Sequence, residues 1–150
     1  MKKKNIYLLP FLILVCVFIY SCSGSDSGTN PKSIRTGTYD YVFRDSLTNR
    51  ILITGVMDID TSGADIYGHY SVTTVADSSF TGYGSVQRGG EFKGHYDKTT
   101  GEISMNMNPR VADANMFINA KVKTKTLNGS WNFSGMRAPS PGGIFKATLQ

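Results

Sequence analysis

Residues 90–108, with the sequence GEFKGHYDKTTGEISMNMN, decide the fold class of this chain. Before the central turn, apolar or small residues occupy every second position from Phe92, and after it apolar residues do so from Ile103. A period of two predicts strands with one buried and one solvated face. Between them, Asp97 can accept hydrogen bonds from nearby backbone N–H groups, and Gly101 can adopt the positive φ of a tight loop. The stretch therefore predicts a β-hairpin.

The same alternation recurs in nine short runs from Thr36 to Gln150, of which Phe80 to Val86 is the fourth. Polar turns join the runs in sequence order, and no segment keeps a period of 3.6. A meander of about eight or nine strands must close on itself or leave exposed edges. Glycines in the middle of strands suit strands that bend sharply around a barrel. We therefore expect an all-β fold, an antiparallel up-and-down β-barrel over residues 36–150, with a β-sandwich as the alternative.

The residues that the alternation turns inward are mostly aromatic residues, methionines and isoleucines. They are Tyr39, Tyr41, Ile53, Met57, Ile66, Tyr70, Phe80, Phe92, Tyr96, Met105, Met107, Met116, Ile118, Trp131, Phe133 and Phe145. An eight-stranded barrel is either filled by its own side chains or holds one small ligand. Large aromatics favour filling, and the volume missing at inward glycines favours a cavity, so both alternatives stay open. In a hollow barrel, the expected ligand-binding residues are Tyr39, Tyr41, Tyr70, Phe92, Tyr96, Met105, Trp131 and Phe133.

The N-terminal residues differ in composition from the rest of the chain. Lys2 to Lys4 are basic, Ile6 to Tyr20 are almost all apolar, and Ser21-Cys22 follows, which is the order of a secretory signal. The apolar run is shorter than the roughly 20 residues that a spanning helix needs. We therefore expect a removed signal peptide at residues 1–21. The polar residues that follow within 22–35 predict a flexible tether, since they have little apolar surface to bury.

Ile19-Tyr20-Ser21-Cys22 resembles the lipobox of bacterial lipoproteins, with Ile19, Ser21 and Cys22 at matching positions. The resemblance implies that Cys22 becomes the first residue and carries a thioether-linked diacylglycerol and an amide-linked acyl chain such as palmitate. Several chains anchor a protein stably, whereas one gives only marginal binding. Ser23 after the cysteine, by the same resemblance, implies the outer membrane of a Gram-negative cell envelope. A plain signal peptide is the alternative.

Cysteine content and charge narrow the function classes. The other cysteine, Cys16, lies inside the expected signal peptide, so the mature domain would have no disulfide, thiolate metal site or cysteine nucleophile. The formal charge of +5 falls to +2 without Lys2 to Lys4, because 13 basic residues then face 11 acidic ones. Such a balance gives no electrostatic argument for nucleic-acid binding.

The domain resembles the lipocalin and avidin group of calycin barrels. Gly37-Thr38-Tyr39 stands where those families begin their first strand with Gly-x-Trp, and Gly-x-Tyr recurs at Gly68-His69-Tyr70 and Gly94-His95-Tyr96. Leu127 to Trp131 and Gly143 to Leu149 look like the closing strand pair of lipocalin-like bacterial lipoproteins. The resemblance implies a barrel with a ligand in its mouth. Avidin-type biotin sites use several tryptophans and this chain has one, so biotin binding is not expected.

Two motifs suggest metal binding but are better explained otherwise. His69 and His95 could bind a metal or relay protons, yet the alternation places both outside the barrel, and spacing assigns no third ligand. Asp58 to Asp65 resembles the first half of a calcium loop, but His69 stands where that loop needs a bidentate glutamate. We therefore expect surface histidines, a polar hairpin turn and no metal.

The remaining patterns point to a binding protein. Lys121, Lys123 and Lys125 predict a solvated strand edge, with anionic headgroups as the alternative contact. There is no Gly-x-Ser-x-Gly motif and no carboxylate pair in an apolar setting, so we expect neither an enzyme nor a cofactor. The sequence predicts an envelope-anchored, lipocalin-like lipoprotein that binds a small apolar or amphipathic ligand beside Trp131, with residues 135–142 as a rim loop. The alternative is a filled barrel that acts as an adhesion or scaffold module through its outer surface.

Overall fold

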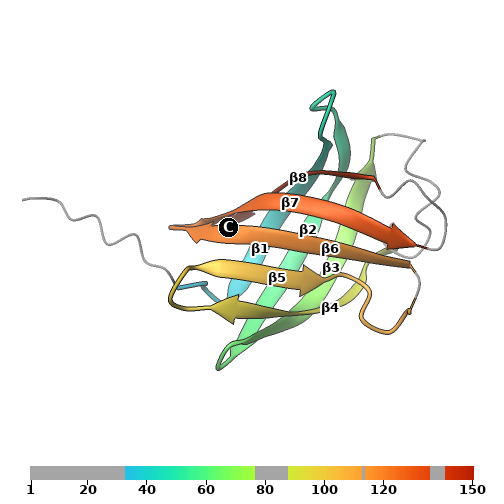
Figure 1. The fold of residues 1–150 in the computed structure, drawn as a ribbon. Helices are drawn as coiled ribbons and strands as arrows, with labels where there is room; N and C mark the ends of the chain where they lie inside the picture. Colours follow the sequence, from blue (N-terminus) through green and yellow to red (C-terminus); the bar gives the residue numbers. More distant parts are fainter. Residues whose placement is uncertain (1–32, 77–87, 113, 136–140) are drawn as a thin grey trace, which may run out of the picture.

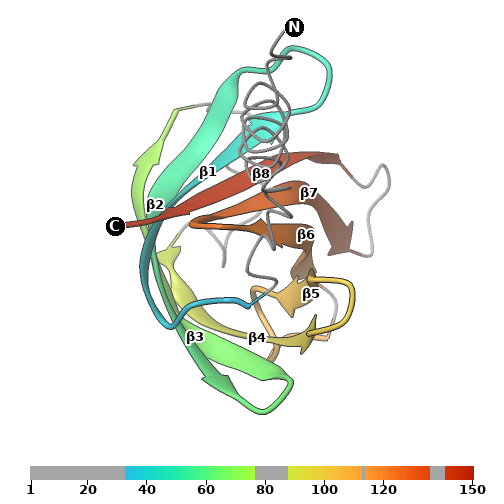
Figure 2. The same cartoon turned by 90° about the vertical axis from the view of Figure 1, so that its left-hand side faces the viewer.

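The computed structural model describes residues 33–76, 88–112, 114–135 and 141–150, which form a barrel. Its strands are β1 (Gly37–Asp45), β2 (Ile51–Ser62), β3 (Asp65–Val75), β4 (Gly90–Asp97), β5 (Glu102–Asn106), β6 (Ala114–Lys123), β7 (Thr126–Gly135) and β8 (Gly142–Leu149). Each strand pairs antiparallel with the next, and β1 also pairs with β8, which closes the barrel (Figures 1 and 2). The predicted all-β, up-and-down barrel is confirmed, with eight strands described. The expected run from Phe80 to Val86 lies outside the described residues.

The β4–β5 hairpin forms as the sequence predicts. Asp97 Oδ1 accepts hydrogen bonds from the backbone N–H groups of Thr99 at 2.7 Å and Thr100 at 3.3 Å. Gly101 has a φ of 76° and donates its N–H to the Asp97 carbonyl oxygen at 2.8 Å. The hydrogen bond from the Thr99 backbone is the main reason that the pKa of Asp97 lies below its ordinary value. An ionised Asp97 therefore fixes this turn and, through it, the register of β4 on β5.

A β-bulge changes the inward face at the start of β2. The alternation that turns Ile53 inward also predicts that Ile51, two residues earlier, points inward; this is wrong, because Ile51 is 38% exposed while the next residue, Leu52, is buried. Phe43 pairs with Ile53 and Arg44 pairs with Ile51, which leaves Leu52 without a partner on β1. One extra residue in a strand reverses the alternation on that side of the bulge. Leu52 thereby joins the core.

The two ends of the barrel differ, and we call them the base and the mouth. The base holds residues 33–36, the C-terminus and the short turns after β2, β4 and β6. Ile34 packs there against the core, and the Tyr39 hydroxyl donates to the Arg35 carbonyl oxygen at 2.7 Å. β1, β3, β5 and β7 end at the mouth, where β2, β4, β6 and β8 begin. The chain therefore enters the barrel at its base, on the side opposite these strand ends.

Candidate functional site

The eight residues predicted to bind a ligand all occupy inward-facing positions. Seven of them are buried, namely Tyr39, Tyr41, Tyr70, Phe92, Tyr96, Met105 and Trp131, and none of the seven is more than 5% exposed. Phe133 is partly buried and packs against the same core. They do not form one site, because Tyr39 and Tyr96 lie near the base whereas Trp131 and Phe133 lie toward the mouth.

An aromatic cluster connects three of these residues near the mouth. Phe43, a fully buried residue of β1 that the sequence did not predict as part of the site, lies at its centre, with ring-centroid distances of 5.2 Å to Tyr41, 5.9 Å to Trp131 and 5.5 Å to Phe145. Tyr70 meets the edge of the Tyr41 ring at 6.5 Å. Such tilted and edge-on pairs stabilise a core beyond simple burial. The cluster therefore packs the part of the interior where a ligand in the mouth was expected.

Polar atoms of the cluster bond to the barrel's own backbone. The indole N–H of Trp131 donates to the Arg44 carbonyl oxygen at 2.9 Å, and the Tyr41 hydroxyl donates to the Ser71 carbonyl oxygen at 3.2 Å. These bonds satisfy groups that would otherwise be costly to bury. Two donors that could fix a ligand's orientation in this region, the Trp131 indole and the Tyr41 hydroxyl, are therefore already used by the fold.

Burial also suppresses acid–base chemistry at the interior tyrosines. Burial raises the pKa of Tyr70 to about 12 and raises the pKa of Tyr41 further, with the nearby Tyr70 adding to the shift of Tyr41. Both phenols are therefore neutral at physiological pH. A group poised for proton transfer would instead have a pKa near the working pH.

Every strand contributes a fully enclosed inward side chain. Phe43, Ile53, Ile66, Phe92, Met105, Ile118, Leu127 and Phe145, one from each of β1 to β8, are at most 1% exposed. A side chain that lined an internal space large enough for water would expose part of its surface to that space. Around the whole circumference, these residues therefore touch protein rather than an open lumen.

The inward glycines do not leave empty volume. A Cβ added at Gly129 would collide with the carbonyl oxygen of Asn119, and one added at Gly94 would collide with that of Ser104. Both obstacles are backbone atoms of the neighbouring strand. The glycines therefore allow close approach of strands, which removes the argument that missing side chains create a cavity.

The outer face carries a groove of about 650 Å³ over β4, β5, β6 and β7. Its side chains include His95, Ser104, Asn119 and Ser130, which lie opposite one another across the four strands. We call this hollow the polar groove. The sequence did not predict this groove, because polar residues at the outward positions of a strand ordinarily form a solvated face. The signal was their consistent polarity, but the register that aligns them was not available from the sequence.

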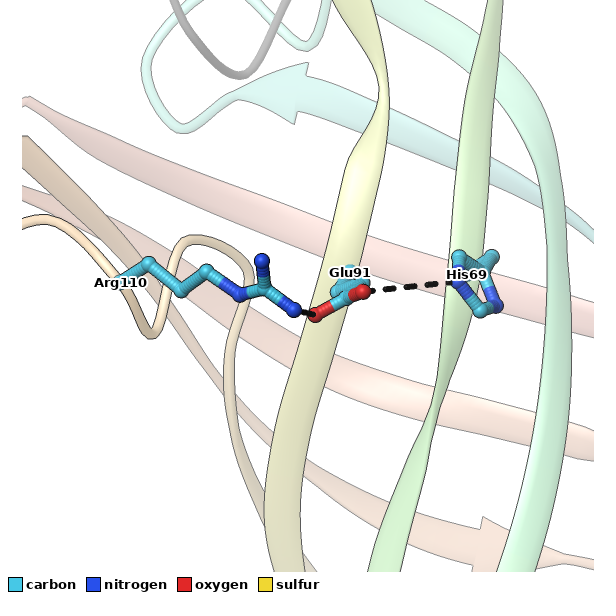
Figure 3. Close-up of polar contacts among 3 residues, drawn as sticks. All are labelled: His69, Glu91 and Arg110. Atoms are coloured by element: carbon cyan, nitrogen blue, oxygen red, sulfur yellow. Dashed lines mark hydrogen bonds and ion pairs between the residues drawn. The ribbon is translucent and has the colours of Figure 1, made fainter.

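The two histidines lie on the outer face but are not brought together. His69 pairs with Glu91 across β3 and β4, and His95 pairs with Asp65. Glu91 also forms an ion pair with Arg110, which lies in the β5–β6 connection; Arg110 Nη2 is 2.6 Å from Glu91 Oε2 (Figure 3). His69 Nε2 lies 3.8 Å from the other Glu91 oxygen. This exposed cluster ties the connection to β4 at the mouth.

The remaining candidate motifs are surface features in the structure. Asp58 to Asp65 spans the β2–β3 hairpin, in which Asp58 accepts a hydrogen bond from the Thr38 hydroxyl at 2.6 Å. In the described ranges, no three His, Cys, Asp or Glu side chains come together as a possible metal site. The prediction of a strand edge at Lys121 and Lys123 is wrong, because β6 pairs with both β5 and β7 in the closed barrel. Lys121 forms an exposed ion pair with Glu102 at 3.1 Å.

Several predictions concern residues that the structure does not describe: the signal peptide, Cys22 and most of its tether, and residues 136–140 of the rim loop. Within the described part of the chain, no helix is long and apolar enough to span a membrane. No protein-family model matches the chain, and no curated protein or solved structure shows significant similarity to it.

Proposed function

We propose that this protein is a lipid-anchored, non-catalytic binding module of the cell envelope whose barrel is a filled scaffold and whose outer surface makes the functional contacts. The observation that carries the proposal is the enclosure of inward side chains from all eight strands, each at most 1% exposed. A ligand the size of a fatty acid would have to displace several of these residues. Repacking a filled core typically costs about 1–3 kcal/mol or more, which would reduce the affinity for any internal ligand.

The sequence supports the anchor, and the fold is compatible with it. The lipobox resemblance ends at Cys22, and the first described residues, 33–36, cross the base of the barrel. A tether of about ten residues therefore separates the proposed acyl chains from the base. With the base toward the membrane, the mouth of the barrel and the outer face near it point away from the membrane.

The anchor is tested on the protein isolated from its cells. We expect mass spectrometry to find Cys22 as the first residue with attached acyl chains, and Cys22→Ser to move the protein out of the membrane fraction. A mature chain that begins at another residue would contradict the anchor but leave the proposal of a filled barrel intact.

The filled interior is tested through Trp131, the only tryptophan in the chain. The full-length protein in detergent micelles is titrated with retinol and with a brominated fatty acid, because bromine quenches an indole that it contacts. We expect no saturable quenching. Phe145→Ala, which opens space next to Phe43 and hence near Trp131, is the positive control and should gain quenching. Saturable quenching of the unmodified protein would contradict the proposal.

A second candidate function is the internal binding of a small apolar or amphipathic ligand at the mouth. The observation that favours it is that Phe133 and Val72, both toward the mouth, are only partly buried although they belong to the core. In this case Phe133→Ala should weaken the quenching by the brominated fatty acid. Tyr67→Ala, which removes an exposed aromatic ring on the outer face, is the matched control and should leave it unchanged.

A further inference from the structure

The polar groove has the size and the lining of a ligand site. Its volume of about 650 Å³ falls within the range of roughly 300–1,000 Å³ that is usual for small-molecule sites. Ile103, Ala120 and Gly129 lie beneath it; the alternation turns their side-chain positions inward, so that the groove floor there is largely backbone. Polar side chains on the neighbouring outward positions form its walls.

The first row of wall residues contains no carboxylate, lysine or arginine and is rich in hydrogen-bonding groups. His95, Ser104, Asn119 and Ser130 pair in register across β4 to β7. Side chains directly opposite on paired strands lie about 4.5–5.5 Å apart at Cβ, so the row forms a continuous set. In the part of the chain that the structure describes, none of these four side chains has a hydrogen-bond partner. Their donors and acceptors are thus available to a ligand.

The second row adds a small negative charge. It consists of Asp97, Glu102, Lys121 and Asn128, again in register across the four strands. Glu102 and Lys121 largely neutralise each other at 3.1 Å, which leaves the Asp97 carboxylate as the excess charge. The residues that line the groove include no arginine, and their one lysine, Lys121, is already paired with Glu102, so the groove has no free cationic side chain for a phosphate or a sulfate. A hydrocarbon chain laid on the groove would leave the outward polar side chains without hydrogen bonds, which is costly.

We propose that the polar groove binds a neutral saccharide of two or three sugar units. Vicinal hydroxyls of a sugar ring offer adjacent donors and acceptors, which matches the paired polar atoms of carboxamide and carboxylate groups. The shallow backbone floor accommodates the C–H face of a sugar ring. This inference rests on the proposed function, because it takes the outer face of the barrel as the binding surface.

The test uses the full-length protein in a detergent without a sugar headgroup, such as an amine oxide. Maltotriose, cellotriose, chitotriose and mannotriose are the neutral probes, and a sulfated trisaccharide is the anionic comparison; binding is measured by calorimetry. We expect at least one neutral probe to bind with a submillimolar Kd. We expect Asn119→Ala and His95→Ala to weaken that binding about tenfold each, as loss of a ligand hydrogen bond typically does.

Matched controls lie on the same outer face. Asn132→Ala and His69→Ala remove the same side chains at exposed positions outside the groove and should change the Kd less than twofold. Thermal unfolding of all four variants should match that of the unmodified protein, which excludes misfolding as the cause of lost binding.

Three results would overturn the saccharide site: no binding of any neutral probe, binding that Asn119→Ala and His95→Ala leave unchanged, or preferential binding of the sulfated probe. Association of two chains that occludes the groove, seen as a dimer that Asn119→Ala dissociates, would also overturn it. These failures are distinct from failure of the proposed function, which is judged by the quenching of Trp131 in the fatty-acid titration.

Discussion

The inner and outer faces of β6 and β7 show two ways in which the same strands use their residues. On the inner face, Ile118 opposes Trp131, and both are enclosed. One residue further along, on the outer face, Asn119 opposes Ser130 in the polar groove. The inner face is determined by packing, so a change there should alter stability. The outer face has few packing constraints, so a substitution there should leave the free energy of unfolding nearly unchanged, and in the polar groove it should weaken the binding that we propose.

The largest expected effect comes from adjacent residues on opposite faces of β8. Phe145→Ala should lower the free energy of unfolding by about 3–5 kcal/mol, because it leaves a hole in the aromatic cluster. Ile144→Ala, its matched control, lies on the outer face and is 44% exposed, so we expect a change within about 0.5 kcal/mol. Urea denaturation measures both. Equal losses would remove the distinction between the two faces.

A smaller effect is expected where the strands approach closely. Gly129→Ala forces a Cβ against the Asn119 carbonyl oxygen, and overpacking of this kind costs about 1–3 kcal/mol. Gly90→Ala is the control, since an added Cβ would lie 3.5 Å from the nearest Tyr70 ring atom, an ordinary contact. If Gly129→Ala were tolerated as well as Gly90→Ala, the strands at Gly129 would not be in close contact. Urea denaturation again gives the comparison.

Tyr41→Phe tests the burial of a polar group on the inner face through the pH dependence of protein stability. The variant loses the hydrogen bond to Ser71 and should lose about 1 kcal/mol at neutral pH. Because burial raises the pKa of Tyr41 in the folded state, the neutral phenol is favoured by folding, and its contribution is lost as pH rises above the unfolded value of about 10. Denaturation between pH 8 and 11 should therefore show a steeper alkaline loss for the unmodified protein than for Tyr41→Phe. Parallel curves would contradict burial of this phenol.

The smallest expected effect concerns the β4–β5 turn. Asp97→Ala should lower the melting temperature at pH 7, because the backbone of Thr99 and Thr100 loses its acceptor. The folded pKa of Asp97 is lowered, so its contribution is present above the unfolded pKa of about 3.9 and is lost as pH falls through the folded value. The difference between the two proteins should therefore narrow below about pH 4. Asp65→Ala, at an exposed position next to another turn, is the control and should shift the melting temperature less.

Local patterns in the sequence were enough to predict the strands, their main turns and most of the core. Alternation depends only on nearest neighbours, and the Asp97–Gly101 turn was confirmed in its hydrogen bonds and its φ. The inward position of Leu52 could not be predicted, since the bulge depends on how β2 pairs with β1. The polar groove was missed for a similar reason, because four strands must align before Asn119 and its neighbours form one row.

The choice between a hollow and a filled barrel also required the structure. The sequence shows which positions are glycine, but not which atoms occupy the space beside each glycine. At Gly94 and Gly129 that space holds the backbone of the next strand. The fold class could therefore be predicted from local sequence patterns, whereas the location of the candidate site depended on tertiary packing.

The pairing of β1 with β8 determines when the barrel can close during folding. Tyr39 lies opposite Leu149, and the Gln150 side chain donates to Asp40, 110 positions earlier. β1 therefore cannot pair with its second neighbour until β8 has been synthesised. Contacts between residues so far apart in sequence form slowly. Synthesis therefore yields a chain whose β1 keeps one unpaired edge until β8 is complete, so the barrel can close only after the last strand has been made.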